Sequence, residues 1–132
     1  MTEELYWLVL TTLMTALFWL PYILNRIMVR GLMGAMGNPS PDDKPEAAWA
    51  VRAHAAHNNA VENLVIFAPL VIATQMLGVS TSLTATMCML YFLARLAHYI
   101  IYVLGIPVAR TLAFALSFVA EVVLALNLLG MM

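Results

Sequence analysis

Four long apolar stretches limit what this chain can fold into more than any other feature of its sequence. They run approximately over residues 5–28, 64–77, 83–104 and 107–132. A helix needs about 20 residues to cross about 30 Å of hydrocarbon, and three of the stretches meet that length unaided. The second does so if residues from about Ala53 onward also lie at membrane depth. Only 10% of the residues are charged, whereas a soluble domain carries about 25%. The sequence therefore predicts an all-α integral membrane protein, a four-helix transmembrane bundle whose first partner is the lipid bilayer.

One polar, proline-rich loop and two tight turns divide the chain into its helices. In the loop, Asp42 or Asp43 is expected to cap the following helix, with Pro45 in its first turn. Residues 78–82 form a turn that ends in a Ser/Thr cap, and residues 105–107 form a turn whose proline begins the last helix. We expect one domain, residues 1–132, with helices over approximately 4–30, 45–77, 81–104 and 107–130.

The distribution of charge predicts the orientation of the chain and excludes some functions. The first stretch opens with Thr-Glu-Glu rather than with basic residues, which favours a retained helix over a signal peptide. The basic residues near short loops flank only the first and third loops: Arg26, Arg30, Lys44, Arg52 and Arg110. By the positive-inside rule these loops face the cytoplasm and both termini lie on the other side. A net charge of −1 argues against nucleic acid as a partner, and the single Cys88 makes no internal disulfide.

Polar side chains on the second predicted helix lie at or near membrane depth, where a charge costs about 2.5–3.5 kcal/mol and is kept when it pairs or has a function. At 100° per residue, Arg52, Asn59 and Asn63 fall within about 40° of one another, and Glu62 lies to one side. The third predicted helix repeats the pattern with a stripe at spacings of four, three and four: Tyr91, Arg95, His98 and Tyr102. We expect the two polar faces to be buried between helices or between subunits.

Structural explanations of these residues compete with functional ones. Glu62 and Arg95 could form only a buried ion pair that fixes helix register. Glu121, in the last helix, is more often a paired interhelical group than a proton carrier. His54 and His57 have the i, i+3 spacing of metal ligands, but no further ligand at suitable spacing accompanies them. We therefore expect no metal site.

Two segments resemble the signatures of a known family. The first is Arg-Ala-His-Ala-Ala-His-Asn-Asn-Ala-Val-Glu-Asn over residues 52–63, which runs into Phe-Ala-Pro-Leu over 67–70. It resembles the second helix of the MAPEG family, the membrane-associated proteins in eicosanoid and glutathione metabolism. Residues 94–102, followed by Gly105 and Arg110, resemble the third helix of that family and the turn after it. The resemblance covers nearly the whole chain and is nearest to the microsomal prostaglandin E synthase branch. Within that branch, the residues of the first segment resemble those of bacterial members.

The resemblance implies a homotrimer of four-helix subunits that holds glutathione between neighbouring subunits near the cytoplasmic side, here in a bacterial inner membrane. Arg110 would be the catalytic residue that stabilises the thiolate. The glutathione site would be formed by Arg52, Asn59, Glu62, Asn63, Arg95, His98 and Tyr102. The sequence departs from the family at Ala55, where a second arginine is usual, and at Asn63, where tyrosine is frequent.

Three functions follow as hypotheses. The first is a microsomal-type glutathione transferase or peroxidase that acts on lipophilic electrophiles or hydroperoxides dissolved in the membrane. The second is a non-catalytic scaffold of the same family that binds a lipid or a thiol. The third is a small multidrug-type transporter with an intramembrane glutamate, which is disfavoured because Arg and Tyr residues are abundant around Glu62.

Overall fold

The computed structural model describes all residues, 1–132, and contains helices but no strands. The five helices are α1 (Glu3–Leu17), α2 (Trp19–Met36), α3 (Ala48–Met76), α4 (Ser82–Leu104) and α5 (Pro107–Leu128). α1 and α2 are stacked end to end, so they form one of the four spans that are long and apolar enough to cross a membrane. The predicted all-α bundle with four membrane-spanning helices is therefore confirmed.

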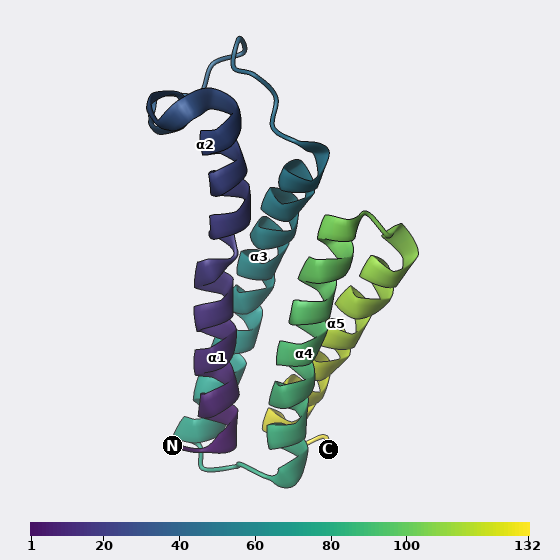
Figure 1. Ribbon diagram of the computed structural model, residues 1–132. Helices are drawn as coiled ribbons and strands as arrows, with labels where there is room; N and C mark the ends of the chain where they lie inside the picture. The colour runs from purple at the N-terminus through teal and green to yellow at the C-terminus, as the bar shows by residue number, and fades with distance from the viewer.

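The four spans alternate in direction, so both termini lie at one end of the bundle and the α2–α3 and α4–α5 connections lie at the other (Figure 1). α4 packs against α1, α3 and α5, whereas α5 contacts only α3 and α4. The loops with flanking basic residues thus share one end. That this end faces the cytoplasm stays a prediction.

The first span is broken at Phe18, a feature that the sequence reading missed. Pro21 has no backbone N–H, so the carbonyl of Leu17 loses its helical donor, and the helix resumes at Trp19. Tyr99 of α4 stabilises the break, because its hydroxyl donates to the carbonyl oxygen of Phe18 at 3.0 Å. The two aromatic rings also stack with their centroids 3.8 Å apart. The hydrogen bond and the ring stacking from α4 therefore fix the geometry of the break.

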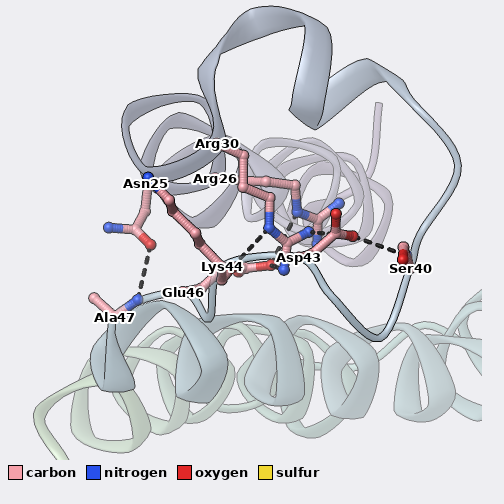
Figure 2. Close-up of polar contacts among 8 residues, drawn as sticks. All are labelled: Asn25, Arg26, Arg30, Ser40, Asp43, Lys44, Glu46 and Ala47. Carbon is pink, nitrogen blue, oxygen red and sulfur yellow. Dashed lines mark hydrogen bonds and ion pairs between the residues drawn. The ribbon is translucent and has the colours of Figure 1, made fainter.

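The α2–α3 loop is tied to α2 by ion pairs (Figure 2). Arg26 Nε lies 2.9 Å from a carboxylate oxygen of Glu46. Arg30 reaches Asp43 at 3.6 Å and Glu46 at 3.8 Å, and its Nε donates to the carbonyl oxygen of Lys44 at 2.9 Å. These contacts keep Asp43 in the loop, where it cannot cap α3.

The start of α3 therefore differs from the prediction. The helix begins at Ala48 and its N-cap, Ala47, has no side chain that can accept a hydrogen bond. Neither Asp42 nor Asp43 caps it, and Pro45 precedes its first turn. Instead, the N–H of Ala47 donates to Oδ1 of Asn25 on α2 at 3.0 Å, as Figure 2 shows.

Replacing Asn25 with alanine is expected to loosen the beginning of α3. The loss of a capping side chain costs about 1 kcal/mol of helix stability, so backbone amides in the first turns of α3 should exchange about fivefold faster with solvent deuterium. Asn38→Ala is the matched control, because Asn38 is exposed in the same loop. Equal exchange rates in the two variants would contradict the capping role.

Small residues allow the helices of the bundle to approach one another closely. Ala50, Ala53, Ala56 and Ala60 form a buried stripe along α3, and such stripes are typical of helix contacts in membranes. Further along α3, the ring of Phe67 stacks on Tyr91 of α4 with centroids 3.8 Å apart. The interior of the bundle also contains polar side chains, whereas large apolar side chains cover its outside. This distribution suits a surface that faces lipid.

Candidate functional site

The candidate site lies where α3, α4 and α5 meet, toward the end of the bundle that carries the α4–α5 turn. A cavity of about 330 Å³ opens there. Its lining residues are Asn59, His98, Tyr102, Arg110, Thr111 and Phe114. Four of these six were predicted as site residues. Thr111 and Phe114 were not, although they follow Arg110 at one and four positions along the same helix.

A tight turn brings Arg110 to the cavity. α4 ends at Gly105, which adopts φ +80°, a conformation that favours glycine. Pro107 then begins α5. As a result, the Cζ atom of Arg110 lies over the ring of Tyr102, 4.3 Å from its centroid. The cation–π contact holds the guanidinium beside the cavity.

Arg52, which lies on α3, stabilises that turn. Its Nε donates to the carbonyl oxygen of Val103 at 3.1 Å. A Cβ atom at Gly105 would lie 3.3 Å from the guanidinium carbon of Arg52, which is unusually tight. Arg52 was predicted to line the glutathione site, and in the structure it supports the turn beside the cavity without lining it.

Behind the cavity, Arg95 organises the polar side chains of three helices. It is only 1% exposed. One terminal nitrogen donates to Oδ1 of Asn59 on α3 at 2.6 Å and lies 3.4 Å from Nδ1 of His98, and the other lies 3.4 Å from the hydroxyl of Ser117 on α5. Because Asn59 and His98 line the cavity, Arg95 positions two of the side chains that form its wall.

Glu62 and Asn63 are placed differently. Glu62 is exposed on the outer surface of α3 and forms no ion pair; the ion pairs of the chain join Arg26 and Arg30 to the α2–α3 loop. The hypothesis of a Glu62–Arg95 pair is therefore wrong for this subunit. Asn63 is buried, and its amide nitrogen donates to the backbone carbonyl of Asn59 at 2.9 Å. It lies next to the cavity without lining it.

The two histidines of α3 face α2 instead of the cavity. The ring of His54 stacks on Tyr22, with centroids 4.6 Å apart. Nδ1 of His57 lies 2.8 Å from the hydroxyl of the same tyrosine. Both side chains therefore contribute to packing between α2 and α3.

The electrostatic character of the cavity suits an anion. Arg110 is the only Arg, Lys, Asp or Glu among the lining residues, and the buried Arg95 adds a second positive charge behind Asn59. A guanidinium presents several N–H donors in a fixed plane and binds carboxylates and other anions well. The cavity can therefore hold a small molecule with an anionic group next to Arg110.

Comparison with known proteins agrees with the resemblance noted in the sequence. No curated protein and no solved structure matches the chain. A model of the MAPEG family, however, matches residues 5–130, which is nearly the full length of the 132-residue chain. This family of membrane proteins includes glutathione transferases and peroxidases as well as eicosanoid synthases. With four membrane-spanning helices and a family match of this extent, the chain belongs to the MAPEG family.

Proposed function

We propose that this protein is a membrane-bound glutathione-dependent transferase or peroxidase that acts on lipophilic electrophiles or hydroperoxides. The observation that carries the proposal is the cavity of about 330 Å³ with Arg110 held over Tyr102 at its edge. Its volume lies in the range of small-molecule sites, about 300–1,000 Å³. Glutathione has two carboxylates and one thiol, so a cavity with a cationic wall and no carboxylate matches its charge.

Arg110 is the catalytic residue of this proposal. A cation beside a thiol favours the thiolate, which is the nucleophile, and so lowers the pKa of the bound thiol. The thiolate sulfur then forms a bond to an electrophilic carbon of the second substrate, whose leaving group departs with the electron pair. With a hydroperoxide, the sulfur attacks the outer oxygen, the O–O bond breaks and the product alcohol takes up a proton. A second glutathione then converts the sulfenic acid to a disulfide and water.

The other predicted residues have supporting roles in this proposal. Asn59, His98 and Tyr102 line the cavity and offer hydrogen-bonding groups to the polar parts of glutathione. Arg95 and Asn63 hold Asn59 in place, and Arg52 supports the turn that carries Arg110. The site lies at the end of the bundle that we assign to the cytoplasm, where glutathione is dissolved.

A homotrimer is part of the same proposal and is supported by Glu62. This residue is the middle one of α3 (Ala48–Met76), so it lies at the centre of a membrane-spanning helix, and it is exposed on the isolated subunit. A charge that faces lipid at this depth is costly. We therefore infer that neighbouring subunits shield the Glu62 carboxylate from the lipid. In the trimer, Glu62 lies at a subunit boundary, where it can also bind the glutathione ammonium group.

The proposal is tested by titrating glutathione into the full-length protein in detergent while the ultraviolet absorbance of the thiolate is followed near neutral pH. We expect a saturable thiolate signal that S-methylglutathione, which has no ionisable thiol, does not produce but does compete away. Glutathione binding without thiolate formation would instead identify a non-catalytic thiol-binding scaffold. Absence of binding at millimolar glutathione would contradict both functions.

A further inference from the structure

The buried guanidinium of Arg95 has no counter-charge among the groups that it contacts. The side chain is 1% exposed, and a guanidinium keeps its positive charge in proteins. Burial of a charge without a charge of opposite sign nearby is very costly. The side chains within hydrogen-bonding range of Arg95 are Asn59, His98 and Ser117, none of which is an acid. A compensating carboxylate is therefore expected beyond these contacts.

Glu121 is the buried acid that the packing of α4 and α5 brings next to Arg95. Arg95 lies 3.4 Å from the hydroxyl of Ser117 on α5. Because the two helices run in opposite directions, the residue one turn earlier on α4, Tyr91, faces the residue one turn later on α5, Glu121. The hydroxyl of Tyr91 donates a hydrogen bond to the carboxyl group of Glu121. Glu121 thus lies one helical turn behind Arg95 as seen from the cavity.

No other acid of the chain is placed for this role. The Asp, Glu, Lys and Arg side chains among the buried residues are Glu4, Arg95 and Glu121. Glu4 lies in the first turn of α1, at the end of the bundle opposite the cavity, and Glu62 is exposed on the outer surface of α3. α5 contacts only α3 and α4, and the titratable groups that act on Glu121 are Arg95 and Tyr91. The buried charges near the cavity are therefore one cation and one carboxyl group.

We propose that Glu121 is a positioning residue of the thiol site and acts through Arg95. Its carboxylate offsets the charge of the Arg95 guanidinium, which can then stay buried and orient Asn59 and His98. Arg110 is left as the uncompensated cation that acts on a bound thiol. Arg95 and Glu121 form no direct ion pair, so the compensation acts through the electric field and not by contact. The inference rests on the proposed function, because it concerns the ionisation of bound glutathione.

Glu121→Gln removes the charge of this side chain and keeps its shape. The field of Arg95 is then no longer offset at the cavity, so the thiolate of bound glutathione is favoured. Eleven residues separate Glu121 from Arg110 on α5, which is about 16 Å at about 1.5 Å per residue. Over this distance, with an effective dielectric constant of about 20–40, we expect the midpoint of thiolate formation to fall by about half a pH unit. The ionisation constant of the bound thiol then rises about threefold.

The measurement is a pH titration of thiolate absorbance at saturating glutathione, with the full-length protein in detergent. Glu121→Asp keeps the negative charge and should keep the midpoint of the unmodified protein. Glu3→Gln is the matched control: it makes the same chemical change at an exposed carboxylate in the first turn of α1 and should leave the midpoint unchanged. A purely structural role of Glu121 would change stability or affinity without this shift.

The reciprocal variant, Arg95→Gln, keeps the test available if Glu121→Gln does not fold. It leaves the carboxylate of Glu121 without its cation, so the midpoint should rise by at least half a pH unit, because Arg95 lies closer to the cavity than Glu121 does. The double variant removes both charges, and its midpoint should lie between those of the two single variants. Shifts of opposite sign in the single variants are the signature of charge compensation.

Three results would overturn the inference. An unchanged midpoint in Glu121→Gln, with a normal thiolate signal in the unmodified protein, would show that Glu121 does not act on the site and would leave the proposed function standing. Shifts of the same sign in Glu121→Gln and Arg95→Gln would indicate general distortion of the site. Absence of a thiolate signal in the unmodified protein would overturn the proposed function and this inference with it, so the behaviour of the unmodified protein distinguishes the two failures.

Discussion

Replacing Arg110 with alanine is expected to remove most glutathione-dependent turnover and to lower kcat/KM by about a hundredfold to a thousandfold, the usual effect of deleting one group that stabilises the reacting anion. Arg110 is the only Arg, Lys, Asp or Glu that lines the cavity. Without it, the thiol of bound glutathione has no adjacent cation, so its pKa rises and less thiolate is present near neutral pH. The measurement is initial conjugation rate with a lipophilic aryl halide, together with thiolate absorbance at saturating glutathione.

Two further variants separate the role of Arg110 from general effects of charge. Arg110→Lys keeps a positive charge but loses the planar guanidinium that lies over Tyr102, so we expect activity between those of the alanine variant and the unmodified protein. Lys44→Ala removes an exposed cation in the α2–α3 loop and should not change the rate. A normal rate in Arg110→Ala would overturn the assignment of Arg110 as the catalytic residue.

Replacing Arg95 with leucine is expected to lower the free energy of unfolding by about 2–3 kcal/mol, the usual effect of losing a buried hydrogen bond from a charged donor. The substitution leaves Oδ1 of Asn59 and Nδ1 of His98 without the guanidinium near them. Leucine fills much of the space but satisfies none of these groups. Stability can be measured by reversible unfolding in mixed micelles, followed by circular dichroism.

The matched control for Arg95 is Ser117→Ala. Its contact with Arg95 is long, 3.4 Å, and its hydroxyl donates to the backbone carbonyl of Phe114 in its own helix. Loss of this hydroxyl leaves no charged group unpaired, so we expect a change below about 1 kcal/mol. If Arg95→Leu were as stable as the control, the polar network would be dispensable for folding, and Arg95 would be retained only for the arrangement of Asn59 and His98.

Features determined by local sequence were predictable. The cap of α4 is one example: Thr81 and Thr84 form a reciprocal pair of side chain–backbone hydrogen bonds, as the Ser/Thr-rich turn predicted. The turn at Gly105 and the start of α5 at Pro107 are another. The cavity-lining side of α4 could also be found from helical spacing, because residues three and four apart share a face.

Features that depend on contacts between distant segments were not predictable in the same way. The break at Phe18 lies within an apolar run, and Pro21 was its only local sign. The true start of α3 depends on Asn25, which lies on another helix. Glu121 was left without a role, because its place behind Arg95 becomes apparent only when α4 and α5 are packed together.

The first residues of the chain have a practical consequence for every experiment described above. Thr2 caps α1, and Glu4 is 2% exposed, with one carboxylate oxygen 2.5 Å from the hydroxyl of Thr84. A purification tag fused ahead of Thr2 would adjoin the residue that caps α1 and lie close in sequence to this buried anchor. Met131 and Met132 are exposed beyond the last helix. Affinity handles and surface-immobilisation linkers therefore belong after Met132, where they leave the anchor of the first span untouched.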